Sequence, residues 1–395
     1  MICISLCKNV IFISYIHIFT SKKGAKSGQK PRFAGGFSEK PVKAAEKADF
    51  RVKFTKTVSS RVIRPHLIIT YSYQYKEGNE IMNKITIIGT GSVGSTIAYT
   101  LTYAGIASEI VMIDINEARA LGEALDIRQG TPYTPPCYVH AGSYADAVDS
   151  NIVIITSGIA RKPGQSRLDL AQTNVNILKS IAPQIVKYAP DATYIIVSNP
   201  VDILTYVFCK VSGIPEDRVI GSGTLLDTAR LRSRLSEYYH INQQNVHAFV
   251  LGEHGDSSLI PWSLVNISNV PIFDYPKTIL GSDRTYDVLN VPEIEDYVRK
   301  SGARIIAGKG ATFYAVSISV CHICKCLMSD VDTALTLSTM MNGEYGISDV
   351  CLSVLCNVSR GRVQNKILLP LTEDEEKRLK ESGKCLKAII DQTEI

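Results

Sequence analysis

The sequence predicts an α/β protein in which a parallel-sheet domain is followed by a mixed α+β domain. From Lys84 onward, short apolar runs alternate with amphipathic stretches, a pattern typical of parallel strands joined by right-handed helical crossovers. Beyond about Gly221 this alternation gives way to longer helical segments, irregular proline-containing sequence and a hairpin. With 395 residues and 45% apolar content, the chain is long enough to bury a core in each of two domains.

Each element of the first domain follows from a local pattern. Short apolar runs bounded by turns or polar residues predict buried strands at residues 85–88, 110–114, 152–155 and 194–197. Helical periodicity between the runs predicts helices at residues 92–104, 117–128 and 168–188. We expect this domain to cover residues 82–223.

The second domain, expected at residues 224–395, opens with a predicted helix at 225–239 and an apolar run at 246–251. We then expect one long helix near residues 291–328 and a hairpin of residues 350–358 and 362–369, with Ser359-Arg-Gly361 at its turn. The capping box Thr372-Glu-Asp-Glu375 opens a final amphipathic helix.

Residues 1–81 differ in charge from the rest of the chain. They carry 15 Lys and Arg against 5 Asp and Glu, a net charge of +10, whereas the remainder carries 28 against 33, a net charge of −5. The body therefore gives no reason to expect a nucleic-acid partner. No run reaches the ~18 uncharged apolar residues of a membrane helix, and Lys8 interrupts an N-terminus that also lacks a cleavage site. We expect neither a membrane partner nor a signal peptide.

The extension has three interpretations. Residues 21–64 are basic and acid-poor, which is typical of a disordered arm or of a transit peptide. We favour a third interpretation, in which Met82 is the native start and residues 1–81 are translated upstream sequence. Lys76-Glu-Gly78 can be encoded by a purine-rich stretch that contains a bacterial ribosome-binding sequence.

Ten cysteines without a small-domain disulfide spacing indicate a reducing compartment, and we expect a cytoplasmic protein. The cluster Cys321-His-Ile-Cys-Lys-Cys326 resembles a metal site, but its apolar neighbours continue a helix and no second Cys/His cluster offers further ligands. We expect buried thiols and no metal.

The motif Gly89-Thr-Gly-Ser-Val-Gly94 follows the first predicted strand and opens a helix. Glycines at this spacing let the backbone approach a pyrophosphate at a helix N-terminus. Asp114 ends the second strand, where its carboxylate can accept hydrogen bonds from ribose hydroxyls and repel a 2′-phosphate. The first domain is therefore predicted to be a Rossmann-type domain that binds NAD.

Tyr206-Val-Phe-Cys-Lys210 matches the Y-x-x-x-K acid/base pair of another nucleotide-dependent reductase class. That class has a differently spaced glycine motif, and Tyr206 lies in an apolar stretch. We expect a core tyrosine.

His254, in Gly252-Glu-His-Gly-Asp256, follows an apolar run between glycines that let a substrate approach. Asp227 and Arg230 are i,i+3 neighbours on a predicted helix, so a carboxylate and a guanidinium can point into one pocket. These three residues are the candidate chemical site.

Four motifs in the same order resemble the lactate branch of the lactate/malate dehydrogenase family: Thr90-Gly-Ser-Val-Gly94, Val197-Ser-Asn-Pro-Val-Asp202, Gly221-Ser-Gly-Thr-Leu-Leu-Asp-Thr-Ala-Arg230 and Gly252-Glu-His-Gly-Asp256. The resemblance covers the chain from Met82 to near the C-terminus. It implies a catalytic α+β domain, a homotetramer, and reversible NADH-dependent reduction of pyruvate to (S)-lactate in fermentative glycolysis.

The resemblance also implies roles for residues. His254 supplies the proton, and Asp227 orients the His254 ring and stabilises its protonated form. Arg230 binds the substrate carboxylate. Arg167 on a closing loop polarises the carbonyl, Asn199 bonds the reacting oxygen, and Thr312 lines the substrate side-chain pocket. The implied cofactor contacts are Gly89, Gly91, Val93, Gly94, Asp114, Arg119, Tyr144, Gly158, Ser198, Asn199 and Ser222.

Arg161 departs from the lactate pattern. Lactate enzymes of the family usually carry Gln there, whereas malate enzymes carry an Arg that pairs with the second carboxylate of oxaloacetate. Glu253 and Thr312 match the lactate enzymes. We expect a lactate dehydrogenase with raised oxaloacetate activity, and malate dehydrogenase is the alternative.

Arg232 and His247 match a pair that binds fructose 1,6-bisphosphate in many bacterial members and promotes the active tetramer. The alternative is a surface arginine and a structural histidine. A remote alternative for the whole chain is a non-catalytic binding protein on a dehydrogenase fold. Such a protein is expected to lose at least one of four residues, but all are retained: His254, Asp227, Arg230 and Arg167.

Overall fold

The computed structural model describes residues 2–7, 10–15, 83–159, 167–279, 286 and 288–395. The chain divides into two compact units, Met1–Tyr75 and Lys76–Ile395. In the first unit, β1 (Ile2–Cys7) and β2 (Val10–Tyr15) pair antiparallel. The interpretations of Met82 as the native start and of residues 21–64 as a disordered arm fall outside the described residues.

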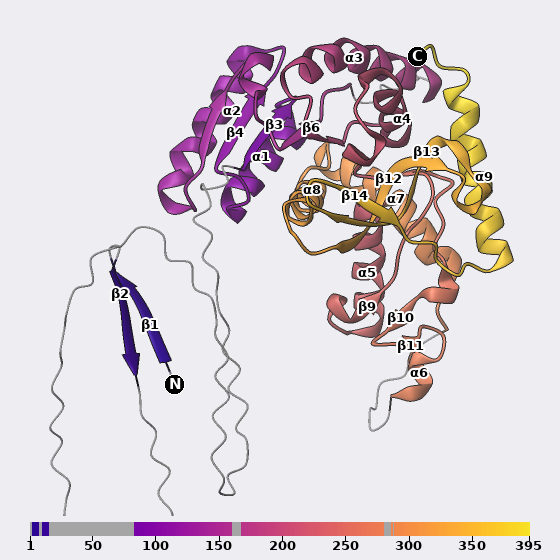
Figure 1. Cartoon of the computed structure of the whole chain (residues 1–395). Coiled ribbons are helices and arrows are strands. Elements are labelled where there is room, and N and C mark those ends of the chain that lie inside the picture. The colour runs from indigo at the N-terminus through magenta and orange to yellow at the C-terminus, as the bar shows by residue number, and fades with distance from the viewer. Residues whose placement is uncertain (1, 8–9, 16–82, 160–166, 280–285, 287) are drawn as a thin grey trace, which may run out of the picture. The chain divides into compact units, whose positions relative to one another are not determined.

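One nine-stranded sheet runs through the second unit and carries both halves of its sequence (Figure 1). Its order is β14-β13-β12-β8-β7-β6-β3-β4-β5. The strands from β8 to β5 pair parallel, whereas β12, β13 and β14 pair antiparallel and extend the sheet from β8. The strands are β3 (Lys84–Ile88), β4 (Glu109–Ile113), β5 (Tyr138–Ala141), β6 (Ile152–Ile155), β7 (Thr193–Ile196), β8 (Val219–Gly221), β12 (Thr333–Asn342), β13 (Ser348–Ser359) and β14 (Arg362–Lys366).

Helices connect the parallel strands and build the second half. They are α1 (Ser92–Ala104), α2 (Glu117–Gly130), α3 (Arg167–Tyr188), α4 (Val201–Ser212), α5 (Leu225–Tyr239), α6 (Tyr275–Thr278), α7 (Val291–Lys309), α8 (Tyr314–Leu327) and α9 (Glu373–Ile390). Short 3-10 turns lie at residues 131–133, 144–147, 216–218, 243–245, 262–264 and 344–346. The predicted α/β fold class, a Rossmann-type parallel sheet followed by an α+β half, is confirmed.

The four predicted parallel strands are present within one residue of their expected bounds, because both faces of each are covered and their apolar runs are continuous. All four residues of β6 are buried. The predicted hairpin is also present as β13 and β14, and the side chain of Thr372 caps α9 together with Glu375 as expected.

One prediction for the second half was wrong. The long helix expected near residues 291–328 is two helices, because Gly310 takes a left-handed φ of 84° and ends α7. The apolar run at 246–251 forms only a two-residue strand, β9 (Val246–His247). It pairs with β10 (Asn266–Ile267), which pairs with β11 (Val270–Pro271), in a small separate sheet.

Two apolar cores stabilise the second unit. The larger one lies along the nine-stranded sheet and includes residues of both sequence halves, such as Ile154 and Leu352. The smaller one lies beneath α5, β9 and α7 and includes Leu235, Val246 and Val298. Among the described residues, no helix combines the length and apolar content needed to cross a bilayer.

Two ambiguous sequence motifs have clear surroundings. Cys321, Cys324 and Cys326 are buried on α8, as the sequence predicted. Tyr206 is also buried, which confirms the core interpretation, and its hydroxyl donates a hydrogen bond of 2.9 Å to Asp349 Oδ1. Lys210, its partner in the Y-x-x-x-K match, forms an ion pair of 2.8 Å with the same carboxylate.

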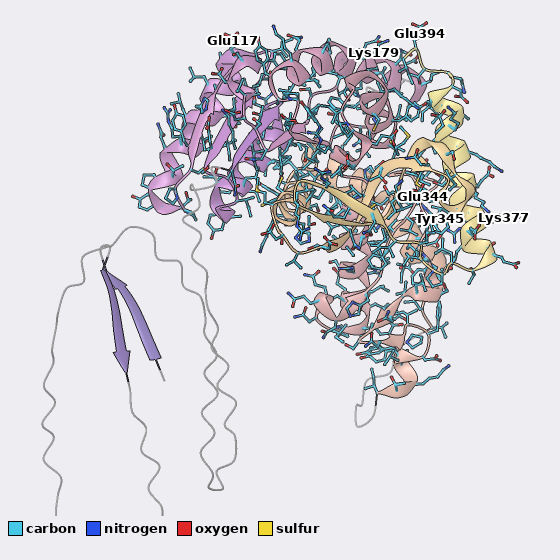
Figure 2. All side chains as sticks on the ribbon, viewed as in Figure 1. Glu117, Lys179, Glu344, Tyr345, Lys377 and Glu394 are labelled. Atoms are coloured by element: carbon cyan, nitrogen blue, oxygen red, sulfur yellow. The ribbon has the colours of Figure 1, made fainter. Side chains whose placement is uncertain are left out.

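The C-terminal residues are tied to α3. The backbone N–H of Glu394 donates to Gln172 Oε1 at 2.9 Å, and the Gln172 amide donates back to the Glu394 carbonyl at 3.3 Å. Lys179 also donates to the Glu394 carbonyl, at 3.4 Å. Figure 2 labels Lys179 and Glu394 near the C-terminus. The helix that begins at Arg167 is thus bonded to the end of the chain.

Candidate active site

The glycine motif forms a tight turn between β3 and α1. Gly89 has a φ of 98°, which side chains rarely tolerate. A Cβ atom on Gly94 would lie 1.9 Å from the Gly89 carbonyl oxygen, so only glycine fits there. Gly91, by contrast, faces open space and is the N-cap residue of α1, where no side chain caps the helix. The first N–H groups of α1 are therefore available to hydrogen-bond an anion, and at Gly91 the anion can approach the backbone closely.

Asp114 lies directly after β4, beside this turn. Its Oδ2 accepts a hydrogen bond from the Thr90 N–H at 2.6 Å, and its Oδ1 accepts one from the Asn116 N–H at 2.9 Å. Burial alone would raise the pKa of this carboxyl, but these hydrogen bonds and nearby Arg119 hold it below its ordinary value. Asp114 is ionised at neutral pH and retains acceptor capacity for a hydroxyl group.

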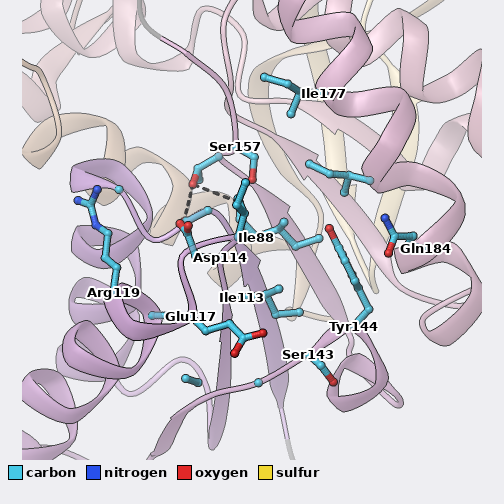
Figure 3. Close-up of a pocket in the computed structure, with 18 of the residues that line it drawn as sticks. Ile88, Ile113, Asp114, Glu117, Arg119, Ser143, Tyr144, Ser157, Ile177 and Gln184 are labelled. Atoms are coloured by element: carbon cyan, nitrogen blue, oxygen red, sulfur yellow. Dashed lines mark hydrogen bonds between the residues drawn. The ribbon is translucent and has the colours of Figure 1, made fainter.

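A cavity of about 1050 Å³ extends from the glycine turn along the carboxyl ends of the strands (Figure 3). Figure 3 shows Arg119 on one side of this pocket and Gln184 of α3 on the other. Six of the predicted cofactor contacts line it: Gly89, Gly91, Asp114, Arg119, Tyr144 and Gly158. The cavity volume, the anion site and the ionised carboxylate fit a dinucleotide.

The remaining predicted cofactor contacts lie outside the lining of this cavity. Val93 and Gly94 are in the first turn of α1. Ser198 is buried beyond β7 and donates to the Ser157 carbonyl at 2.6 Å, and Ser222 follows β8. Asn199 is exposed beyond β7. All of them follow the carboxyl ends of parallel strands, the edge at which ligands bind in such sheets.

His254 and Asp227 form the chemical pair that the sequence predicted. Asp227 Oδ2 lies 2.6 Å from His254 Nδ1. The Asp227 side chain comes from the first turn of α5, whereas His254 lies in the loop that is closed by the bridge between Leu251 and Leu259. The Asp227 side chain is only 9% exposed, and the imidazole is 25% exposed. One ring nitrogen is therefore held in the interior while the ring remains accessible.

The charges of this pair reinforce each other. The Asp227 carboxylate is the main cause that raises the pKa of His254 to about 8, against the opposing effects of burial and Arg230. Burial would raise the pKa of Asp227, but His254 and Arg230 hold it below its ordinary value. The imidazole is therefore mostly protonated near neutral pH and can give or take a proton there.

Arg230 completes the constellation. Its Nη1 donates to Asp227 Oδ1 at 2.7 Å, as the i,i+3 spacing predicted. A Cβ atom on Gly302 would lie 3.6 Å from Arg230 Nη2, so α7 passes directly beside the guanidinium. A cation held this way beside a protonated imidazole can bind a small carboxylate and present its neighbouring carbonyl to the proton donor.

The substrate loop is only partly described. Arg161 lies outside the described residues, and Arg167 is the first residue of α3. Thr312 is half-buried in the connection between α7 and α8. Their contacts with a substrate stay predictions.

Asn174 of α3 was not predicted. Its side chain accepts from the Ile159 N–H at 2.9 Å and donates to the Asn199 carbonyl at 2.7 Å. It therefore fastens the start of the substrate loop to the segment that carries Asn199. The sequence signal was a polar side chain on the same helical face as Ala171 and Leu178, both buried.

Arg232 and His247 lie at neighbouring positions of the second half. Arg232 Nε donates to the carbonyl of Ala248 at 3.1 Å, one residue beyond His247, and its guanidinium lies 5.6 Å from the Phe249 ring centroid. His247 is exposed on β9.

Comparisons with known proteins agree with this geometry. Residues 83–221 match the family model described as lactate/malate dehydrogenase, NAD binding domain, and residues 224–394 match its alpha/beta C-terminal domain. The L-lactate dehydrogenase of Thermoanaerobacter sp. (strain X514) is 45% identical over 314 residues, which are 80% of this chain and all of the relative. L-lactate dehydrogenase 1 of Clostridium acetobutylicum is 44% identical over 308 residues, 78% of this chain and 97% of the relative.

A solved structure shows the same likeness. The minor L-lactate dehydrogenase from Enterococcus mundtii superimposes with a TM-score of 0.75 at 36% identity, over 80% of this chain and 100% of that one. The NAD-binding half with its glycine turn and the half that supplies His254 are thus both accounted for by one family. The chain belongs to the lactate/malate dehydrogenase family and is an NAD-dependent oxidoreductase.

Proposed function

We propose that the protein is an L-lactate dehydrogenase that catalyses the reversible NADH-dependent reduction of pyruvate to (S)-lactate. The observation that carries this proposal is the constellation of Asp227, His254 and Arg230, in which one carboxylate bonds both a proton donor and a carboxylate-binding cation. The names of the relatives support the same reaction. We also propose a role in fermentative glycolysis in the cytoplasm, which the absence of a disulfide spacing among the ten cysteines supports.

Each site residue has a separate role in the reduction of pyruvate. Arg230 binds the pyruvate carboxylate, and His254, protonated through Asp227, donates its proton to the carbonyl oxygen as that oxygen becomes a hydroxyl. Bound NADH supplies the hydride. Asn199 hydrogen-bonds the reacting oxygen, Arg167 polarises the carbonyl when the loop closes, and Thr312 lines the pocket for the methyl group.

The test of this proposal is product identity. Incubation with pyruvate and NADH is expected to yield (S)-lactate, resolved by enantioselective chromatography. His254→Asn is expected to lower the rate by about a hundredfold or more, because it removes the proton donor. A protein that oxidises no NADH with any keto acid would instead support a binding role on a dehydrogenase fold.

Arg161 favours a second candidate, malate dehydrogenase. A guanidinium closed over a methyl group loses hydration without gaining a partner, whereas oxaloacetate offers it a carboxylate. A long guanidinium can instead extend toward solvent. We therefore propose pyruvate as the preferred substrate, with oxaloacetate accepted more readily than in enzymes that carry Gln. Arg161→Gln is expected to raise the preference for pyruvate.

Arg232 and His247 are the proposed site for fructose 1,6-bisphosphate, acting across an interface of a homotetramer. Two cations suit a bisphosphate, and the position of Arg232 beside the segment that follows His247 supports the pairing. Adding the bisphosphate is expected to lower KM for pyruvate and raise the tetramer population in sedimentation. No change in either quantity would leave Arg232 and His247 as structural residues.

A further inference from the structure

A second carboxylate lies behind His254. Asp202, in the first turn of α4, is 2% exposed, and its Oδ2 accepts a hydrogen bond of 2.8 Å from the backbone N–H of His254. Asp227 holds the same residue from α5 through the ring. Two carboxylates on different helices therefore hold one histidine, one through its backbone and one through its imidazole.

The other oxygen of Asp202 is unusual. Among the described residues, three buried side-chain polar atoms lack a hydrogen-bond partner, and two of them are Asp202 Oδ1 and the hydroxyl oxygen of Ser338. Buried polar atoms are rarely left in this state in folded proteins. Ser338 favours the ionised form of Asp202, so its hydroxyl lies near this carboxylate although neither atom has a hydrogen-bond partner.

The sheet brings Ser338 to this position. Ser338 of β12 pairs with Gly221 of β8, where the antiparallel strands join the parallel ones. A Cβ atom on Gly221 would lie 2.8 Å from Ser338 Cβ and 2.4 Å from Thr205 Oγ1, so only glycine leaves room for this approach. The junction of the two sheet halves thus places Ser338 beside Thr205 of α4, the helix that carries Asp202.

The charge of Asp202 acts on His254. Burial raises the pKa of Asp202 to about 6, against the opposing effects of Ser338 and the backbone N–H of His254, and Glu253 raises it further. Asp202 raises the pKa of His254 in turn, after the larger effect of Asp227 and against Arg230. Cys351 of β13 also faces Asp202, but burial raises its thiol pKa well above the ordinary value, so it adds no charge.

We propose that Asp202, with Ser338 near it, is a positioning residue for catalysis: it fixes the backbone of His254 and supplies a second negative charge that keeps the imidazole protonated near neutral pH. This inference rests on the proposed dehydrogenase function. An amide at position 202 could accept the same backbone hydrogen bond without the cost of burying a charge. We therefore infer that the carboxylate is there to stabilise the positive charge of His254.

The test compares Asp202→Asn with the unmodified protein in two measurements. NMR titration of the His254 imidazole gives its pKa directly, and the pH profile of kcat/KM for pyruvate gives its effect on the reaction. We expect the pKa of His254 to fall by about one unit. The rate is then expected to fall about tenfold above pH 8 and to change little below pH 6, with KM at low pH unaffected.

Ser338→Ala extends the test without changing a charge. It is expected to lower the pKa of His254 in the same direction by a smaller amount, and to have no further effect when combined with Asp202→Asn. Asp217→Asn removes a carboxylate that pairs with Arg362 at 3.3 Å before β8, and it serves as the control with an unchanged profile.

Three results would overturn the inference. The first is an unchanged pKa of His254 in Asp202→Asn, and the second is a rate loss of equal size at every pH, which would indicate a structural role. If Asp202→Asn does not fold, an unchanged pKa in Ser338→Ala is the third. Unmodified protein that reduces neither pyruvate nor oxaloacetate would contradict the proposed function instead, and the NMR titration would still test the contact.

Discussion

The imidazole of His254 has one nitrogen bound and one available for chemistry. Nδ1 lies 2.6 Å from Asp227 Oδ2, so Nε2 is the nitrogen that can exchange a proton with a substrate. The carboxylate fixes the ring orientation and favours the charged ring, and both effects act before a substrate arrives. A proton donor prepared in this way is suited to reduction of a carbonyl at neutral pH.

The direction of the reaction should decide the sign of its pH dependence. Reduction of pyruvate needs protonated His254, whose pKa is raised to about 8 mainly by Asp227. We expect kcat/KM for pyruvate to fall as the pH rises through about 8, and kcat/KM for lactate to rise through the same range. Steady-state assays at saturating cofactor measure both, and parallel profiles in the two directions would contradict the role of His254.

Asp227→Asn tests the partner of the histidine. The amide can keep the contact with the ring but not the charge, so the imidazolium loses its largest stabilising influence. We expect kcat for pyruvate to fall by about a hundredfold or more and the high-pH decline to move to lower pH. Affinity for NADH, measured by fluorescence titration, should stay unchanged because Asp227 does not line the cofactor cavity.

Some site residues could be predicted from sequence and others could not. Asp227 and Arg230 lie three positions apart on a helix, so local geometry alone brings them together. Asn174 and Asp202 have their partners at positions 159, 199 and 254. Those contacts exist only after the strands are assembled, and no local spacing indicates them.

At the scale of elements, the turn between β3 and α1 contains glycines with two different roles, one in folding and one in cofactor binding. Gly94 has no space for a Cβ atom, whereas Gly91 has nothing within 4 Å and an ordinary φ of −65°. Gly94 is needed by the fold, whereas Gly91 leaves room where a pyrophosphate would approach.

Alanine at each position should separate these uses. Gly94→Ala is expected to lower both the melting temperature and the affinity for NADH, because the turn must open. Gly91→Ala is expected to keep the melting temperature and to weaken NADH binding by about tenfold, because the added methyl group meets only the cofactor. Differential scanning fluorimetry and fluorescence titration measure the two effects. Equal loss of stability in both variants would contradict this division.

The elements that the sequence did not predict have tertiary causes. β12 was missed because Thr336 and Ser338 interrupt its apolar pattern, yet both are buried. Thr336 shares a hydrogen bond of 3.1 Å with Thr228 of α5, a partner that the sequence of the strand cannot reveal. The break between α7 and α8, by contrast, had a visible signal in Gly310.

At the scale of the whole molecule, the two sequence halves share one sheet. β12 joins β8 through the pairing of Ser338 with Gly221, so the half that supplies His254 is hydrogen-bonded to the half that forms the cofactor cavity. Sequence predicted two successive domains because the alternation of strands and helices stops near this junction. It could not show that the later strands would extend the earlier sheet.

Asp349 ties distant elements of this assembly together. It accepts hydrogen bonds from Tyr206 at 2.9 Å and from Lys387 of α9 at 2.6 Å, beside the ion pair with Lys210 of α4. Because the carboxylate is half exposed, removing its charge should lower the stability of the protein only modestly.

We expect Asp349→Asn to lower the melting temperature by about 1–3 °C and to leave the kinetics with pyruvate unchanged. Asp330→Asn is the matched control, since its carboxylate is exposed and lies 3.8 Å from Arg360. Calorimetry that finds the same melting temperature for both variants would show that Asp349 adds nothing to the docking of α9.

The substrate preference is tested most directly by comparing kcat/KM for pyruvate and for oxaloacetate, each with NADH, in the unmodified protein and in Arg161→Gln. We expect pyruvate to be preferred by the unmodified protein, oxaloacetate to be reduced as well, and the substitution to lower the oxaloacetate rate selectively. A preference for oxaloacetate in the unmodified protein would contradict the proposed lactate dehydrogenase function and would indicate a malate dehydrogenase.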